Sequence, residues 1–352
     1  MSDVLCEERN GVGYITLNRP QALNSLNLMM VRGMHQALKD WEQDTSVKAV
    51  LVSGVGEKAF CAGGDIRSVY ENEMFGKDDN MIFFAEEYAL NQYIFEYPKP
   101  YIAIMDGFVM GGGMGISQGA SFRIVTERSK ISMPESGIGF FPDVGGSYFL
   151  PRCPGSLGLY LGITGVIVNS EDAIYAGLAD AFLPAEKLTL LRQEIDKINW
   201  SDDSHRDIKN LLCNLSCRNH AIDPSLQKLH QSIDRHFSQL TIPDIIASLS
   251  EEVSAEHQDW ARKTIEIMNK RSPISMVGTQ QMLRYGKQLN LSECFAMELG
   301  LVKVWLKRGD FVEGVRALII DKDNQPRWRY TLAELTPEFM RPFFEHVKAI
   351  SL

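Results

Sequence analysis

The sequence predicts an α/β fold with a mixed or parallel sheet, followed by a mainly helical region. Strand–strand–helix patterns repeat over the first half of the chain, which is typical of α/β proteins. After the polar stretch SDDSHRD (201–207) the pattern is mostly helical, with few strand signals. We therefore expect two regions, residues 1–200 and residues 201–352.

The first elements are expected between residues 11 and 54. Alternating apolar residues in GVGYITLN (11–18) predict a strand. Apolar residues at helical spacing predict a helix over residues 25–44, with Ser25 as its N-cap. VKAVLVSG (47–54) has the composition of a buried strand and ends in glycine.

The same pattern returns further along the chain. Residues 78–97 predict a helix, residues 101–107 a strand, and Gly112 the start of a short helix. Two short strands are expected at residues 122–127 and 130–135. In the helical region, the pattern of residues 242–273 fits either a helix pair or one long helix.

Composition indicates an ordinary globular protein. Apolar residues make up 45% of the 352 residues and charged residues 23%. The first residues, MSDVLCEERNG, have no targeting pattern, and no apolar run is long enough to cross a bilayer. We expect no membrane partner, and a cytoplasmic location, or the mitochondrial matrix if the chain is the mature form of an organellar protein.

The net charge of −9 argues against nucleic acid as a partner. The charge is uneven, because residues 262–329 carry a net charge of +6 and the remainder −15. A basic region on an acidic protein is compatible with a polyanionic small ligand. The alternative is a set of solvated helix faces without a ligand, and charge alone favours that alternative.

Six cysteines are scattered along the chain. Cys213 and Cys217 are four residues apart, but no histidine or third cysteine lies at metal-site spacing, so we expect reduced thiols and no metal site. Cys61 has no basic neighbour in the sequence and is interpreted as a small packing residue rather than a nucleophile.

Two glycine-rich stretches each follow a predicted strand and precede a predicted helix. They are AFCAGGDIRSVY (59–70), in which Asp65 is a suitable helix N-cap, and MGGGMGIS (110–117). Glycine lets a ligand approach the free N–H groups of such a helix start, and two converging N–H groups would form an oxyanion hole. Each stretch alone is compatible with a simple tight turn. Neither matches a nucleotide-binding glycine motif.

The segment PESGIGFFPDVGG (134–146) contains two acids, Glu135 and Asp143. No histidine occurs between His35 and His205, so carboxylates are the remaining acid/base candidates in this part of the chain. Apolar neighbours are expected to raise a carboxyl pKa by desolvation: Ile138, Phe140 and Phe141. Considered singly, Glu135 is equally compatible with a surface or helix-capping acid, and Asp143 with an Asx turn after Pro142.

A third acid lies on the predicted helix 78–97. Phe83, Leu90 and Ile94 place Glu87 on an apolar stripe. Glu86 has similar neighbours, so periodicity does not choose between the two. A position at the edge of the stripe, with the charge in solvent, is an equally weighted alternative.

Taken together, five separated segments resemble one known family. They are NRPQALNSL (18–26), AFCAGGDI (59–66), GFVMGGGMGIS (107–117), PESGIGFFPDVGGSYFLPR (134–152) and GDFVEGVRALIIDKDNQPRW (309–328). The first four resemble the crotonase, or enoyl-CoA hydratase/isomerase, superfamily in order and spacing. The last resembles its 3-hydroxyisobutyryl-CoA hydrolase branch.

The resemblance implies a crotonase-like spiral of ββα units with a helical C-terminal region. It implies that the backbone N–H groups of Gly64 and Gly112 bind the thioester oxygen. It also implies that Ala22, Ala62 and Ile66, together with Gly64, line the groove for coenzyme A. The basic segment would then meet phosphates, although no particular Lys or Arg is assigned. No separate cofactor is implied, since CoA is part of the substrate.

The resemblance also assigns the acids. Hydratases of the superfamily use two glutamates, and this chain has Gly115 in place of the first and Glu135 in place of the second. The hydrolase branch pairs the latter with an acid eight residues on, which is Asp143 here. Glu87 matches the acid that contacts the substrate, where it could meet a hydroxyl of the acyl group.

The leading interpretation is a hydrolase of a short branched 3-hydroxyacyl-CoA, as in valine breakdown. Glu135 would attack the thioester to give a mixed anhydride, or would act as a base for water, with Asp143 assisting. One alternative is a lyase or isomerase on acyl-CoA, which Gly115 weighs against in its hydratase form. Another is a non-catalytic acyl-CoA binding protein. A homo-oligomer is possible.

Overall fold

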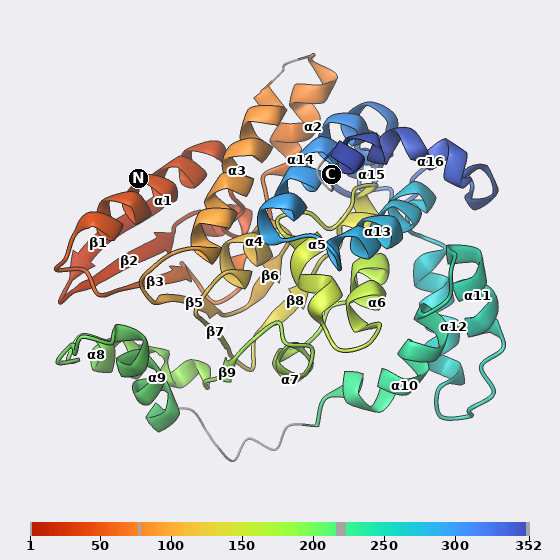
Figure 1. The fold of residues 1–352 in the computed structure, drawn as a ribbon. Coiled ribbons are helices and arrows are strands. Elements are labelled where there is room, and N and C mark those ends of the chain that lie inside the picture. Colours follow the sequence, from red (N-terminus) through yellow and green to blue (C-terminus); the bar gives the residue numbers. More distant parts are fainter. Residues whose placement is uncertain (1, 77–78, 216–222, 350–352) are drawn as a thin grey trace. The chain divides into compact units, whose positions relative to one another are not determined.

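The structure, a computed structural model, describes residues 2–76, 79–215 and 223–349 (Figure 1). The chain forms two compact units, each built from three segments. Unit 1 comprises Met1–Gly64, Ala89–Ile131 and Ile167–Pro224, and unit 2 comprises Asp65–Tyr88, Ser132–Val166 and Ser225–Leu352. The predicted regions 1–200 and 201–352 remain a prediction about organisation along the chain.

Unit 1 contains a six-stranded mixed sheet in the order β1-β2-β3-β5-β7-β9. Its strands are β1 (Val4–Arg9), β2 (Val12–Leu17), β3 (Ala49–Gly54), β5 (Tyr101–Met105), β7 (Phe122–Val125) and β9 (Ala181–Phe182). β1 and β2 are antiparallel, and the remaining neighbours are parallel. The mixed sheet expected from the sequence is confirmed; β1 was not predicted.

A second sheet has three short strands in the order β4-β6-β8. They are β4 (Ala59–Cys61), β6 (Phe108–Met110) and β8 (Lys130–Ser132). Along the chain, one long-sheet strand, one short-sheet strand and one helix follow each other three times. The helices that end these repeats are α2 (Ile66–Met74), α4 (Gly112–Gln118) and the short 3₁₀ helix η2 (Glu135–Ile138). The repeated ββα pattern is therefore present, as predicted.

Helices cover both faces of the long sheet. Figure 1 shows α1 (Leu28–Gln43) on one side of the strands and α8 (Leu188–Ile195) and α9 (Ser204–Leu215) on the other. Alternation along β2 explains this, because successive side chains of a strand point to opposite faces. Tyr14 belongs to the core under α8 and α9. At the preceding residue, a Cβ on Gly13 would lie 2.4 Å from Trp41 of α1, so only glycine lets this tryptophan approach the sheet.

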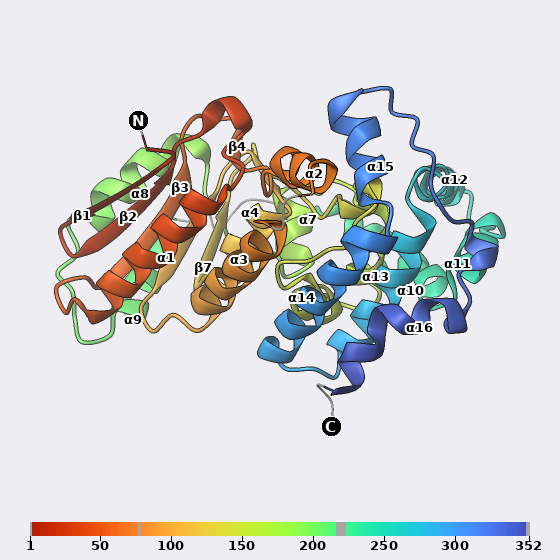
Figure 2. The same cartoon turned by 90° about the horizontal axis from the view of Figure 1, so that it is seen from above.

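The start of α1 differs from the prediction. The N-cap is Asn27, whose side chain accepts a hydrogen bond from Met30 N at 2.9 Å, so the expectation of Ser25 was wrong. Asn27 is extended (φ −108°, ψ 169°), as an N-cap requires. α1 runs along the first strands of the sheet (Figure 2). The N-cap prediction for Asp65 is confirmed, since its side chain accepts from Ser68 N at 3.3 Å.

Unit 2 is mainly helical. Besides α2, the first part of α3 (Asp79–Phe95) and η2, it contains α5 (Gly146–Phe149), η3 (Leu150–Arg152), α6 (Leu157–Thr164), α10 (Ser225–Phe237), α11 (Ile242–Ser250), α12 (Gln258–Met268), α13 (Pro273–Gly286), α14 (Leu291–Arg308), α15 (Phe311–Val315), η5 (Arg316–Ile320), η6 (Leu332–Glu334), α16 (Pro337–Phe344) and η7 (Glu345–Ala349). The predicted helical C-terminal region is confirmed. Residues 242–273 form the helix pair α11 and α12, not one long helix.

The core of unit 2 is organised around Trp305 of α14, which is fully buried. Its ring meets Phe141 and Phe343 edge-on, with centroids 5.1 and 5.4 Å away. Its indole N–H donates to Gly139 O at 2.9 Å. Trp305 therefore links α14 to the segment that follows Glu135.

Candidate active site

Glu135 is the first residue of η2 and is buried in unit 2. Pro134 precedes it as the N-cap, and the 3₁₀ turn closes at Gly139, whose φ is 71°. A Cβ at Gly139 would lie 2.3 Å from Asp310 O, so this turn requires glycine. Among the described residues, Glu135 Oε2 has no hydrogen-bond partner. The alternative of a surface acid is wrong, because Glu135 is buried.

Asp143 is buried as well and is held by Tyr88 of α3. The Tyr88 hydroxyl donates to Asp143 Oδ2 at 2.7 Å. The Asx-turn alternative for Asp143 does not hold, because the N–H two residues on, that of Gly145, donates to Glu298 instead. The Tyr88 hydroxyl thus orients the Asp143 carboxylate.

Glu87 lies on α3 immediately before Tyr88, and only 2% of its surface is exposed. Glu86, by contrast, is only partly buried. The structure thus decides what helical periodicity left open, and the alternative of a solvated edge position is wrong. Within the part of the chain that the structure describes, Glu87 Oε1 has no hydrogen-bond partner either.

The three acids interact electrostatically. Burial first, and then the Asp143 charge, raises the pKa of both Glu87 and Glu135 well above the ordinary range. Burial also raises the pKa of Asp143, to about 7, although the Tyr88 hydrogen bond opposes this shift. Because the sites are coupled, protons belong to the cluster rather than to one residue. The cluster can therefore hold both a protonated and an ionised carboxyl near neutral pH.

A cluster of buried aromatic rings includes residues next to these acids in the sequence. Phe140 stacks on Phe84 and Phe141, with centroids 5.7 and 4.4 Å apart, and meets Phe311 edge-on at 5.5 Å. All four rings are buried, and Phe140 and Phe141 belong to the segment between Glu135 and Asp143.

Sequence reasoning missed two members of this site, Tyr88 and Glu298. Glu298 on α14 is fully buried, and burial raises its pKa to about 8 with a further contribution from Asp143. Its sequence neighbours Phe295, Leu301 and Val302 form the same kind of apolar stripe that drew attention to Glu87. That signal could have revealed Glu298. Tyr88 offered none, because its role depends on a contact with a residue 55 positions away.

The two glycine stretches converge in unit 1. β4 and β6 pair in parallel, so both stretches begin at the same edge of the short sheet. A Cβ on Gly63 would lie 3.5 Å from Met110 O and 3.9 Å from Gly112 N, which places the two loops against each other. A Cβ on Gly113 would lie only 2.2 Å from Cys61 O, so this close approach requires glycine. Cys61 itself is buried, as expected of a packing residue.

Gly64 and Gly112 lie next to this contact. Gly112 is the first residue of α4, where an N–H group has no partner within its helix. Gly111 before it has a φ of 46°, and Gly63 before Gly64 has a φ of 108°. Both loops thus depend on conformations that favour glycine. The oxyanion hole remains a prediction, but the two loops that would form it do meet.

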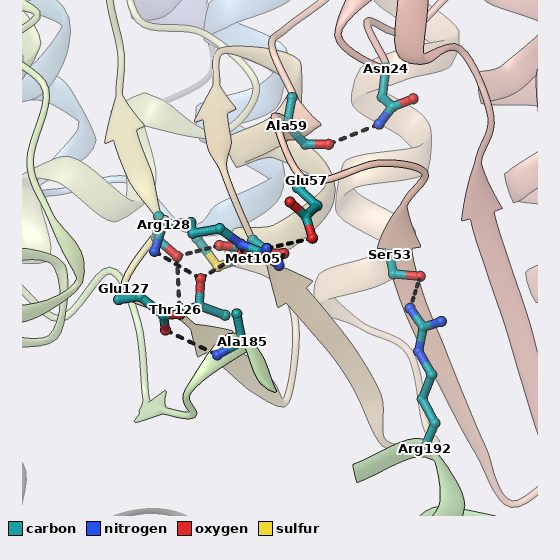
Figure 3. Close-up of polar contacts among 12 residues, drawn as sticks. Asn24, Ser53, Glu57, Ala59, Met105, Thr126, Glu127, Arg128, Ala185 and Arg192 are labelled. Atoms are coloured by element: carbon teal, nitrogen blue, oxygen red, sulfur yellow. Dashed lines mark hydrogen bonds and ion pairs between the residues drawn. The ribbon is translucent and has the colours of Figure 1, made fainter. Parts of the chain in front are cut away.

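Ala22 and Ala62, two of the predicted CoA-groove residues, belong to adjoining loops of unit 1. Ala62 N donates to Leu23 O at 3.0 Å, and Ala22 ends the 3₁₀ helix η1 (Pro20–Ala22). Asn24 fastens this loop, since its buried amide donates to Ala59 O at 2.8 Å (Figure 3). The same amide also donates to Val55 O at 3.1 Å. Ile66, the third groove residue, begins α2 in unit 2.

A charged network braces the connections of unit 1. Arg128 donates to Asp106 at 2.9 and 2.5 Å and pairs with Glu57 at 3.0 Å (Figure 3). Thr126 Oγ1 donates to the same Asp106 at 2.6 Å. This network joins the loops before β4, between β5 and β6, and between β7 and β8.

Some cations of the basic segment are paired with nearby carboxylates. Arg316 pairs with Glu313, Asp321 and Asp323 at 2.8, 2.5 and 2.7 Å. Arg262 pairs with carboxylates of its own helix. Such pairing fits the solvated-face alternative for those residues.

None of the cysteines in the described residues is in a disulfide, and Cys217 lies outside those residues; the described cysteines are Cys6, Cys61, Cys153, Cys213 and Cys294. The described residues contain no cluster of three or more His, Cys, Asp or Glu arranged to hold a metal ion. In the same residues, no helix is both long and apolar enough to cross a membrane.

A family model described as enoyl-CoA hydratase/isomerase matches residues 12–344. The chain belongs to the enoyl-CoA hydratase/isomerase family. A Danio rerio relative named "3-hydroxyisobutyryl-CoA hydrolase, mitochondrial" is 42% identical over 97% of this chain and 89% of its own length. The Homo sapiens protein of the same name is 39% identical over 99% and 90%, respectively.

Solved structures of the family confirm the predicted crotonase-like fold. A carnitinyl-CoA dehydratase from Mycobacterium thermoresistibile has a TM-score of 0.89 at 38% identity, covering 98% of this chain and 96% of its own. An enoyl-CoA hydratase from Rhodobacter sphaeroides has a TM-score of 0.87 at 36% identity, with 97% of each chain covered. The relatives thus bear names of different reactions on CoA thioesters.

Proposed function

We propose that the protein hydrolyses the thioester of a short branched 3-hydroxyacyl-CoA, with 3-hydroxyisobutyryl-CoA as its substrate. Water adds oxygen to the acyl carbon, the C–S bond breaks, and the free acid and CoA leave. One observation carries this proposal: Asp143 and Glu135 belong to one buried, coupled acid cluster, while Gly115 stands where a hydratase would need its first glutamate. The names of the curated relatives support the same substrate.

The backbone N–H groups of Gly64 and Gly112 would bind the thioester oxygen as it becomes an oxyanion. Such donors stabilise charge that develops only in the transition state. Ala22, Ala62 and Ile66 would line the groove for the CoA moiety. A dedicated cofactor has no step in this scheme.

Glu135 would then act in one of two ways. It attacks the carbonyl carbon to give a mixed anhydride that water opens, or it removes a proton from an attacking water. Its unpartnered Oε2 supports both schemes. Asp143, with a pKa raised to about 7, is suited to give a proton to the departing thiolate and take one from water.

Glu87 would select the acyl group. An isolated buried acceptor is costly unless a donor reaches it, and none of the described residues donates to Glu87 Oε1. The 3-hydroxyl of the substrate would supply that donor. A site built around such a contact discriminates against substrates that lack the hydroxyl.

A lyase is the second candidate, because the two solved relatives are titled as a dehydratase and a hydratase. Gly115 removes the first acid of the two-glutamate hydration, which favours hydrolysis. A non-catalytic CoA-binding protein is disfavoured, since three buried carboxyls with raised pKa values are costly to retain without a use.

The relatives' names favour the mitochondrial matrix over the cytoplasm, and a role in valine breakdown would follow from the substrate. A homo-oligomer remains a prediction.

One pair of assays tests the proposal. Purified protein is given 3-hydroxyisobutyryl-CoA while free thiol is followed, and crotonyl-CoA while the enoyl absorbance is followed. Thiol release with little loss of absorbance is expected. Absorbance loss without thiol release would establish the lyase instead, and binding without either reaction would establish the non-catalytic alternative.

A further inference from the structure

The backbone after Asp143 adopts an unusual conformation. Val144 and Gly145 both have positive φ values, 52° and 88°. Glycine tolerates this region, but valine is branched at Cβ and rarely enters it. Such an outlier persists only where the surroundings impose it, and such outliers cluster at functional sites.

Glu298 imposes this conformation from a distant part of the sequence. Its Oε2 accepts from Gly145 N at 2.8 Å, and its Oε1 accepts from Ser147 N at 2.9 Å and from Ser147 Oγ at 2.5 Å. Glu298 is fully buried on α14, and its contacts lie more than 150 residues away in sequence. The Glu298 carboxyl group thus binds the N–H group of Gly145, at the end of the strained turn, and that of Ser147, two residues further on.

The turn has no substitute for this carboxylate nearby. Gly145 is the N-cap of α5 and has no side chain with which to cap the helix. Asp143 contributes only its carbonyl, which accepts from Gly146 N at 2.7 Å. The Asp143 carboxylate is engaged by Tyr88 instead. Glu298 therefore caps α5. Without it, the Asp143 side chain would be the acceptor for the N–H groups of its own turn.

We propose that Glu298 is a positioning residue for Asp143. By capping α5 in place of Asp143, it holds Val144 in the left-handed conformation and leaves the Asp143 carboxylate free for Tyr88 and the reaction. This inference rests on the proposed hydrolase function for its kinetic consequences, but not for its structural ones.

Glu298→Gln is the principal test. An amide offers one acceptor oxygen and one NH₂ group, so one of the two backbone N–H groups would face a donor. We expect kcat to fall by about 10- to 100-fold with KM little changed, since small displacements of a catalytic group have effects of this order. Ser147→Ala, which removes only the hydroxyl donor, should give a smaller loss and provides a second variant if Glu298→Gln does not fold.

A double-mutant cycle separates positioning from general destabilisation. If Glu298 acts through Asp143, Glu298→Gln should have little further effect on kcat in an Asp143→Asn background. An equal fold-loss in both backgrounds would overturn the proposal. Glu252→Gln is the matched control, because Glu252 is a buried acid that contacts His236 and Ser254 rather than the cluster. Glu252→Gln should lower the melting temperature. It should not change the ratio between the kcat of the protein with Asp143 and the kcat of the Asp143→Asn variant.

A crystal structure of Glu298→Gln distinguishes failure of this inference from failure of the hydrolase assignment. Val144 should leave positive φ, and the Asp143 carboxylate should leave the Tyr88 hydroxyl. If Asp143 stayed in place, the inference would be wrong whichever thioester reaction the protein catalyses. If the wild type released no thiol but Asp143 moved in the variant, only the hydrolase assignment would be lost.

Discussion

The two halves of the proposed chemistry are built in different ways. In unit 1, the predicted oxyanion donors belong to the backbone, and they depend on glycines that let two strand ends approach each other. In unit 2, the acids are side chains from α3, η2, the segment after it and α14, brought together in a buried cluster. A backbone site depends on local conformation, whereas a side-chain cluster depends on long-range packing. Substitutions should therefore fail differently in the two units.

The largest effect is expected in the side-chain cluster. Glu135→Gln removes the nucleophile or base while keeping its size, so thiol release should fall by roughly 10³-fold or more, as for other groups that carry a covalent or proton-transfer step. Stopped-flow detection of free thiol measures this. A Glu135→Gln protein that releases thiol at the normal rate would remove Glu135 from the mechanism.

Heavy-oxygen water sharpens this result for the wild type. In a single turnover, a covalent scheme places label in the Glu135 carboxylate whenever water attacks the enzyme side of the anhydride, and mass spectrometry of the peptide detects it. Direct attack by water labels only the product acid. Label in Glu135 would establish the anhydride, whereas its absence fits attack at the acyl side as well.

The backbone site should respond next. Gly112→Pro deletes the N–H donor, and one such donor is worth about 2.7–4 kcal/mol, or roughly 10²–10³ in kcat. Gly112→Ala retains the N–H group and is the matched control. Because proline also disturbs the start of α4, a structure of the variant must accompany the kinetics. Normal turnover by a correctly folded Gly112→Pro protein would mean that this N–H does not bind the oxyanion.

The buried acids of unit 2 should also make the stability of the fold depend on pH. Burial raises the pKa of Asp143 from its ordinary value of 3.8 to about 7. Between these values the folded protein keeps a proton that the unfolded chain has lost, so this group lowers stability as pH rises through the interval. Asp143→Asn should therefore stabilise the fold by roughly 1–3 kcal/mol at pH 8 and hardly at pH 4.

Thermal unfolding at the two pH values measures this difference. Asp259→Asn is the control with the opposite sign, because hydrogen bonds from Lys263 and then Arg262 lower the pKa of Asp259 on an exposed face. It should bring no stabilisation at pH 8. If Asp143→Asn destabilised the protein equally at both pH values, ionisation of the buried Asp143 carboxyl would not lower the free energy of unfolding, contrary to the prediction.

The smallest effect is expected at Glu87. If its free oxygen meets the substrate hydroxyl, Glu87→Gln should lower kcat/KM for 3-hydroxyacyl thioesters by about 10-fold more than for analogues without the hydroxyl. Glu86→Gln, one position earlier and not buried, is the matched control. An equal loss on both substrate types would indicate that Glu87 serves the fold rather than acyl selection.

The sequence predicted the parts of the molecule that depend on local rules. The mixed sheet, the ββα repeats and the helical C-terminal region follow from periodicity, and Asp65 follows from capping chemistry. Ser25 failed as an N-cap because Asn27, two residues later, is an equally good cap whose side chain reaches Met30 N. Periodicity alone left Glu86 and Glu87 equivalent, and only the burial of Glu87 separates them.

Long-range partners could not be predicted in the same way. Tyr88 and Glu298 act through contacts across 55 and about 150 residues, and no local pattern encodes which chain segments meet. An acid on an apolar stripe was a usable sign for Glu298, as it was for Glu87. The partner of such an acid, however, is fixed only when the whole unit folds.

The ββα repeat has a consequence for how this scaffold changes its chemistry. Gly64 follows the short strand of the first repeat, Gly112 that of the second, and Glu135 that of the third. In the proposed mechanism, each repeat would thus contribute its own functional group. Gly115 in the second repeat and Asp143 after the third are the two positions at which the resemblance predicts a hydrolase rather than a hydratase. If the proposal holds, a change between these activities would need exchanges only near the ends of repeats, outside the strands that form the scaffold.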